Sequence, residues 1–390
     1  LAFGAALLLL VLALFKYYNL VLPLLPLAPG ALHSLPFPLG VSFYTFAALS
    51  YLIDVRRGDL PAERSLVGLA AFLCFFGTIT AGPICRARLI LPQLKAEHRF
   101  EAARTVRALQ LFALGLFKKV AVADVLLLFA QQVFGDLSGH GGPALLLALV
   151  FYTFYLYFDF VGYSEMARAS ALLLGLDIPE NFKTPFFATN FSGFWSRWHI
   201  SLSSWFRDYV YIPMGGNRCA WWRQALNLIV TFLASGLWHG ASWNYIFWGI
   251  YYLIFLLLER FVIQGRIPKG WNHVYTLLVV FFGWVIFRFE DLGELGTVLL
   301  GLFGIGTSGF AGLEASTVFM GNIFFLIFAV IGVTSLGKNI RKFLFDTGKT
   351  NEAAFMVFNV LEMLTPPFLL ILSVLSLIGA SYNPFLYFQF

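Results

Sequence analysis

The sequence predicts an all-α, polytopic membrane protein: a helical bundle with broken or re-entrant helices around a central cavity. Hydrophobic residues make up 59% of the 390 residues and charged residues 12%, whereas soluble domains carry about 25% charge. Apolar runs long enough to cross a bilayer recur along the chain. One run of 35 residues, Gln224–Leu258, contains no Asp, Glu, Lys or Arg and has His239 near its middle.

The amino-terminal region predicts helices separated by prolines. The stretch from Tyr17 to Ile53 has no formal charge but contains five prolines, and proline breaks a helix because it lacks an N–H donor. We expect a span that ends near Leu27 and another that begins near Leu39. The next candidate spans are apolar runs bounded by charge, proline or glycine: Ser65–Cys85, Ala102–Phe134 with Lys118 and Lys119 interrupting it, and Pro143–Phe160.

The middle and carboxyl-terminal regions continue this pattern. Ser164–Leu176 is too short to cross a bilayer unaided, since a span needs about 20 residues. The glycine-rich stretch Leu295–Gly312 is either re-entrant or interfacial. The later candidate spans are Trp271–Phe287, Ala315–Gly337 and a final one within Ala353–Ala380. With the run around His239 counted as two, we expect about nine or ten crossings.

The run around His239 predicts a broken helix. As one helix it would be about 52 Å long, against a hydrocarbon core of about 30 Å. Gly236 and Gly240 flank the histidine and weaken a helix. Non-helical backbone is tolerated at membrane depth only inside protein or beside a cavity, and an intramembrane polar residue indicates a functional site. We therefore expect His239 at a break that faces water or substrate.

The stretch Asn190–Arg218 predicts an amphipathic helix. An apolar stripe recurs at three- and four-residue spacing and a polar face lies opposite; the stripe is Trp195, Trp198, Leu202, Trp205 and Tyr209. The plain interpretation is a helix at the membrane boundary, where tryptophan and tyrosine gather. The functional interpretation is that it dips inward and presents His199, Arg207 and Asp208 to the cavity of His239.

Two segments carry a family resemblance: Phe194–Arg218, which includes Trp198-His199, and Gly236–Gly240. Together they resemble the membrane-bound O-acyltransferase family. The ending Tyr211–Arg218 is similar to that of its bacterial alginate O-acetyltransferase branch, as are Leu39–Phe46, Ala81–Arg86 and Phe158–Ala167. The resemblance covers nearly the whole chain, so we expect a single domain over residues 1–390. Relatives carry further spans before this start, which implies that native amino-terminal spans are missing.

The resemblance implies acetyl transfer from a cytosolic thioester donor, acetyl-CoA, to hydroxyls of an extracytoplasmic polysaccharide. An alcohol is a poor nucleophile until its proton is being removed, and histidine, with an unperturbed pKa of about 6.5, suits that work. By the resemblance, His239 is the catalytic base and His199 a second functional histidine. An alternative is that Ser235 or Ser242 carries the acyl group covalently, with His239 as its base.

Further residues are expected to bind substrate, and no metal is expected. The predicted substrate-binding residues are Trp238, Asn244, Arg197, Trp198, Arg207 and Asp208. Either Asp208 or Asn244 would fix a histidine tautomer, and the sequence does not choose between them. Arg197 and Arg207 also have a plain interpretation as contacts to lipid headgroups.

The expected partners are the lipid bilayer, the thioester donor, the polysaccharide and a periplasmic or extracellular protein that completes the transfer. The expected location is the bacterial cytoplasmic membrane. We read the net charge of +6 as topology and expect no nucleic acid, because loops rich in Lys and Arg tend to stay cytoplasmic. One alternative function is D-alanyl transfer to teichoic acid, which the Pro213–Arg218 ending disfavours. Another is a transporter with a proton relay through His239, Asp159 and Glu165, although no internal repeat supports it.

Overall fold

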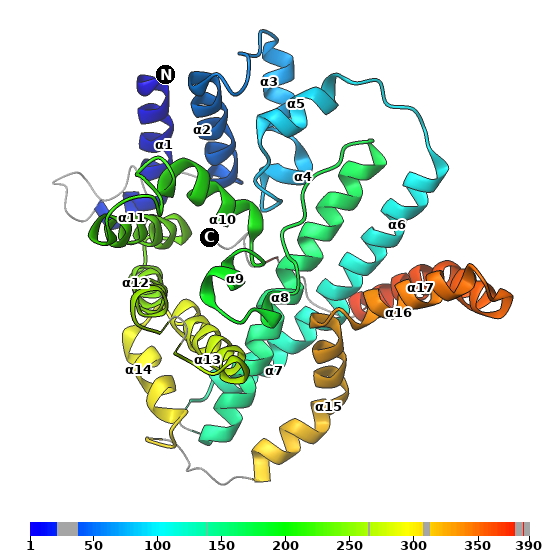
Figure 1. The fold of residues 1–390 in the computed structure, drawn as a ribbon. Coiled ribbons are helices and arrows are strands. Elements are labelled where there is room, and N and C mark those ends of the chain that lie inside the picture. Colours follow the sequence, from blue (N-terminus) through cyan, green and yellow to red (C-terminus); the bar gives the residue numbers. More distant parts are fainter. Residues whose placement is uncertain (22–37, 138, 264–265, 307–312, 379–384, 386–390) are drawn as a thin grey trace.

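The structure is a computed structural model that describes residues 1–21, 38–137, 139–263, 266–306, 313–378 and 385. This part of the chain contains helices and no strand (Figure 1), which confirms the predicted all-α class. In chain order the α-helices are α1 (Ala2–Val21), α2 (Val41–Arg57), α3 (Leu66–Leu73), α4 (Phe76–Ile79), α5 (Ala87–Lys95), α6 (Ala102–Phe117), α7 (Asp124–Phe134), α8 (Gly142–Leu173), α9 (Phe191–Trp195), α10 (Ile200–Phe206), α11 (Trp221–His239), α12 (Trp243–Leu258), α13 (Lys269–Arg288), α14 (Leu292–Gly301), α15 (Leu313–Val333), α16 (Leu336–Gly348) and α17 (Glu352–Leu377). Three π-helical segments are η2 (Lys118–Ala123), η4 (Arg207–Tyr211) and η5 (Glu259–Ile263).

Helix α8 is the central element of the bundle. It is 32 residues long, and 83% of its apolar 18-residue window is buried. The expected separation of Pro143–Phe160 from Ser164–Leu176 is therefore wrong, because one helix covers nearly all of both. The charges that suggested the division are neutralised by α6–η2: Lys119 Nζ lies 2.7 Å from Asp159 and Lys118 Nζ lies 2.6 Å from Glu165.

The predicted interruption at Lys118-Lys119 is a local change of helix type. α6 continues through the π-helical segment η2 into α7 without a break in the helical backbone. Gly162 lets α8 approach α6 closely, since a Cβ on Gly162 would meet the Gly115 carbonyl oxygen of α6 at 2.7 Å. The two lysines therefore join α6–η2–α7 to α8 and do not end a span.

The predicted break in the run Gln224–Leu258 is confirmed. α11 ends at His239, the backbone is extended at Gly240, and α12 starts at Trp243. The two helices pack at glycines, because a Cβ on Gly236 would meet the Tyr245 carbonyl oxygen at 2.5 Å and one on Gly240 would meet the Tyr245 ring at 2.4 Å. The break thus places His239 at a tightly packed helix end.

The sequence predicted one amphipathic helix over Asn190–Arg218, and this prediction is wrong. α9 ends at Trp195, α10 begins at Ile200, and η4 follows directly. His199 lies between α9 and α10 with φ 42°, in the left-handed region, which divides the expected apolar stripe. The inward-turning interpretation is closer to this geometry, because His199 is buried.

Four helical stretches among the described residues are long and apolar enough to cross a membrane: residues 142–173, 243–263, 270–288 and 352–377. The predicted span Ser65–Cys85 is wrong, since it forms the short helices α3 and α4. In the glycine-rich stretch Leu295–Gly312, Leu295 and Val298 belong to α14 and are buried. Residues 307–312 of this stretch lie outside the described residues, as does the predicted span end at Leu27. The number of crossings stays a prediction.

Helices α16 and α17 pack side by side and project from the body of the bundle (Figure 1). Only 6% of the apolar window of α17 is buried. Large apolar side chains such as Phe355, Met363 and Phe368 are exposed along it. In a polytopic membrane protein such a surface faces lipid, whereas α8 faces protein.

Candidate active site

The two predicted histidines line one cavity, although 40 residues of chain separate them (239 − 199). The cavity has a volume of about 200 Å³, and its wall is mostly apolar. Its polar and charged wall residues are Ser192, His199, Ser203, Arg207, Tyr211, Thr231, Ser235 and His239. An apolar cavity with a few convergent polar groups is the usual form of a small-molecule site.

His199 is held in a strained backbone conformation. Its φ of 42° and ψ of 55° lie in the left-handed region, which a residue with a Cβ seldom adopts. Such strain costs of order 1–3 kcal/mol and persists only where the surroundings enforce it. Here Asn181 does so: its carbonyl oxygen accepts from the Ile200 N–H at 3.0 Å and its Oδ1 from the Ser201 N–H at 3.0 Å. No pattern in the sequence pointed to Asn181.

The His199 ring is 2% exposed and packs edge-on against Phe160, with 4.6 Å between centroids. Trp238 is a neighbour of both histidines. Its ring centroid is 6.2 Å from that of His199 and 5.0 Å from that of His239. Trp238 therefore contacts both imidazoles, although it is not among the cavity wall residues.

The His239 ring lies in an aromatic enclosure. Its centroid is 4.9 Å from Trp248 of α12 and 5.2 Å from Phe287 of α13, both approximately edge-on, and 6.2 Å from Tyr245. The histidine is 6% exposed. Such walls exclude bulk water and leave the cavity as the route by which a reactant reaches the ring.

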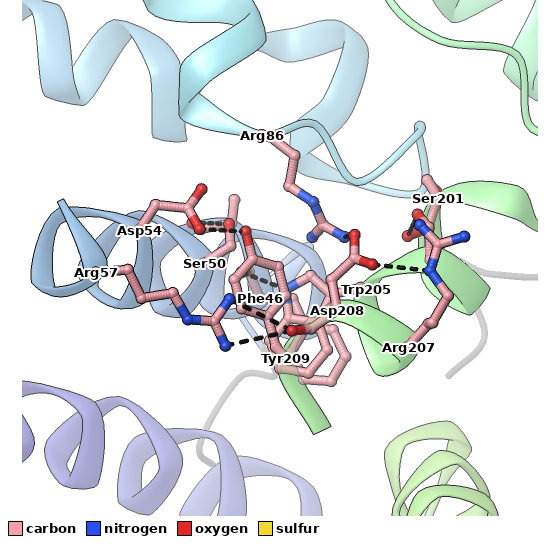
Figure 2. A network of polar contacts seen from close by, with 12 residues as sticks. Phe46, Ser50, Asp54, Arg57, Arg86, Ser201, Trp205, Arg207, Asp208 and Tyr209 are labelled. Carbon is pink, nitrogen blue, oxygen red and sulfur yellow. Dashed lines mark hydrogen bonds and ion pairs between the residues drawn. The ribbon is translucent and has the colours of Figure 1, made fainter. Parts of the chain in front are cut away.

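Arg207 connects the cavity to the outside. It is a wall residue, yet its side chain is 63% exposed, which places it at the cavity mouth. Arg207 Nε donates to Asp208 Oδ1 at 2.8 Å (Figure 2). Asp208 Oδ2 in turn lies 3.6 Å from Arg86 Nη2, and its main-chain carbonyl accepts from Arg57 at 3.3 Å. The structure therefore places Asp208 in a polar network beside the cavity and not in its wall.

The same network anchors η4 to α2. Tyr209 donates its hydroxyl proton to Asp54 Oδ1 at 2.7 Å, and the Arg86 guanidinium lies 4.5 Å from the Tyr209 ring centroid (Figure 2). Trp205 of α10 stacks on Phe46 of α2, with 3.9 Å between centroids. These contacts fix the segment from which Arg207 reaches the cavity.

The other predicted site residues lie at different distances from the cavity. Trp198 and Ser235 are wall residues, whereas Arg197, Asn244 and Ser242 are not. Asn244 is fully buried, and its Nδ2 donates to the Phe287 carbonyl oxygen at 3.0 Å, which ties α12 to α13. The Arg197 carbonyl accepts from the Lys183 N–H at 3.0 Å. The hydrogen bond from Asn244 thus stabilises the aromatic enclosure of His239, because it joins the two helices that supply the enclosing side chains.

Sequence reasoning missed much of the cavity wall. Trp195, Trp248 and Trp284 line it, and their buried indole N–H groups have no hydrogen-bond acceptor among the described residues. Buried tryptophan N–H groups usually find a partner. Their aromatic character was indistinguishable in the sequence from lipid-facing or core packing, because periodicity does not report which residues share a cavity.

Comparison with known proteins identifies the family that this chain resembles. Residues 9–292 match the family model described as MBOAT, membrane-bound O-acyltransferase family. A probable alginate O-acetylase from Pseudomonas putida is 37% identical over 403 residues, covering 97% of this chain and 82% of the relative. A peptidoglycan O-acetyltransferase from Helicobacter pylori is 33% identical over 69% of this chain and 57% of the relative. A teichoic acid D-alanyltransferase from Bacillus subtilis is 31% identical over 66% and 69%.

Proposed function

Because this chain belongs to the membrane-bound O-acyltransferase family, we propose that it moves an acetyl group from a cytosolic thioester, acetyl-CoA, to hydroxyls of an extracytoplasmic polysaccharide. The enzyme is an O-acyltransferase and a multi-pass integral membrane protein. The observation that carries the proposal is that His199 and His239, from separate segments, line one cavity. A base for an alcohol and space for a small acyl group thus occur together.

His239 is the proposed general base. The acceptor hydroxyl oxygen attacks the thioester carbonyl carbon while its proton passes to the imidazole of His239. The C–S bond then breaks, the new ester C–O bond remains, and the proton moves from the imidazolium to the departing thiolate. The aromatic enclosure of His239 favours transfer to the acceptor over hydrolysis, because it limits the water that would otherwise hydrolyse the thioester.

His199 is proposed to orient the acceptor hydroxyl or to assist proton transfer. Arg207, at the cavity mouth, has the charge and planar fork to contact donor phosphates, and Asp208 orients its guanidinium. We assign Trp198 to the acyl-binding wall and Trp238, Asn244 and Arg197 to supporting it.

Covalent transfer through a serine is the less favoured route. Ser235 lines the cavity four residues before His239 on α11, which places both on one helix face. Ser242 is not a wall residue. Ser235→Ala separates the routes: a covalent mechanism loses transfer, whereas direct transfer retains it.

The names of the relatives support the proposed acceptor and location. They are named for alginate, peptidoglycan and teichoic acid, which supports a cell-envelope polymer, the bacterial cytoplasmic membrane and a periplasmic or extracellular partner that completes the transfer. D-alanyl transfer is the alternative within the family, and the higher identity and coverage of the alginate relatives disfavour it. The proton-transport alternative is weakened, because Asp159 and Glu165 are paired with lysines.

The test is acetyl transfer by the purified protein. With acetyl-CoA and an alginate oligosaccharide, His239→Gln should reduce transfer by about 10²–10⁴-fold. The control is His98→Gln, which alters an exposed histidine bonded only to the Gln93 carbonyl among the described residues. Transfer by the His239 variant equal to that of the His98 variant would contradict the proposal. A transporter would show no histidine-dependent thioester turnover at all.

A further inference from the structure

Two side chains of α1 hold the end of the helix that carries His239. The last carbonyl groups of an α-helix have no N–H partner within the helix and need one elsewhere. The Lys16 ammonium donates to the main-chain carbonyl of Trp238, and the Tyr17 hydroxyl donates to that of Leu237. These donors stand 222 and 220 residues earlier in the chain.

Lys16 has further contacts at the same place. Its Nζ donates to Ser42 Oγ of α2 at 3.2 Å and lies 5.3 Å from the centroid of the Trp238 ring. A positive charge is favourable at the carboxyl end of a helix, where the helix dipole is negative. A lysine in an otherwise apolar helix is costly to bury unless such partners compensate. These contacts account for its presence in α1.

The residues that Lys16 holds are adjacent to the proposed base. Trp238 precedes His239 in the chain, and its ring centroid lies 5.0 Å from that of His239 and 6.2 Å from that of His199. Lys16 is not a cavity wall residue. Lys16 contacts the main-chain carbonyl and the ring of Trp238, which gives it an indirect route to the proposed base.

We propose that Lys16 is a positioning residue for acyl transfer: with Tyr17 it caps α11 and holds Trp238 and His239 in register with the cavity. This inference rests on the proposed role of His239 as base. Small displacements of a catalytic group are costly, since about 1 Å of misplacement can lower a rate by about 100-fold. Loosening the cap should therefore slow the chemical step more than it weakens donor binding.

The experiment compares kcat and KM for acetyl-CoA in Lys16→Met, which keeps length but removes the donor, and Tyr17→Phe, which removes one hydroxyl. The matched control is Tyr18→Phe, because Tyr18 is also on α1 and makes no hydrogen bond among the described residues. Monodisperse protein in detergent should show kcat lowered by about tenfold in Lys16→Met and by about threefold in Tyr17→Phe, with KM within about twofold. Tyr18→Phe should match wild type.

Each other outcome decides a different question. Wild-type kcat in Lys16→Met, with His239→Gln inactive, overturns the positioning role and leaves the proposed function standing. Equal turnover in wild type and His239→Gln overturns the proposed function itself. If Lys16→Met does not fold, Tyr17→Phe decides: reduced kcat at unchanged KM supports the cap, and wild-type kcat refutes it.

Discussion

The strained backbone at His199 predicts an inverted order of stability between two substitutions. His199→Ala and His199→Gly both remove the imidazole and differ only in the Cβ. At φ 42° a Cβ costs about 1–2 kcal/mol that glycine avoids. Glycine loses more chain entropy than alanine on folding, which destabilises the folded glycine variant by about 0.4–1 kcal/mol. The net effect makes His199→Gly more stable to unfolding than His199→Ala by about 0.5–1 kcal/mol. Within a helix the order is normally reversed, and the glycine variant is less stable than the alanine variant.

The assay is thermal unfolding of both variants in the same detergent, followed by tryptophan fluorescence. For a chain of this length the expected difference corresponds to about 0.6–1.2 °C in Tm. The same pair of substitutions at Ser203, inside α10, is the control and should show the usual order, with alanine more stable. An alanine variant at His199 as stable as the glycine variant would refute the claim that Asn181 and its neighbours hold this residue under strain.

Two further predictions concern the polar contacts between helices. Lys119→Met should destabilise the protein by about 3–5 kcal/mol, because the buried Asp159 carboxylate loses the ammonium group that lies 2.7 Å from it, and adding Asp159→Leu should restore part of the loss. A double variant no more stable in thermal unfolding than the single one would argue against this contribution of the pair. Tyr209→Phe removes a hydrogen bond to the Asp54 carboxylate and should cost about 1.5–3 kcal/mol, measured in the same way, and an unchanged Tm would mean that η4 is anchored by other contacts.

The parts of this architecture that depend on length and composition were predictable. A charge-free run longer than the bilayer is thick has to break, and the small residues around His239 located that break within one residue of the observed helix end. The division of α8 was predicted wrongly because Asp159 was read as the end of a span. Its partner Lys119 stands 40 residues earlier, and such pairing across helices leaves no local signal.

The candidate site was predictable where a residue is chemically unusual in its surroundings. An imidazole in an apolar run is such a residue, and Arg207 is another. The stripe through Trp198 and Leu202 suggested one continuous helix, because spacing reports local periodicity and not the hydrogen bonds from Asn181 that turn the backbone at His199. Nothing in the sequence singles out Lys16, since its acceptors are formed by a distant helix end.

The length of α8 has a consequence for how the bundle sits in lipid. A helix of 32 residues extends about 48 Å, well beyond a hydrocarbon thickness of about 30 Å. Tilting alone does not absorb this excess, because membrane helices rarely incline by more than about 40°. At least one end of α8 must therefore lie among the lipid headgroups. Because protein encases α8, we expect peripheral helices such as α17 to adapt to thicker or thinner membranes and the cavity that contains His239 to be shielded from such changes.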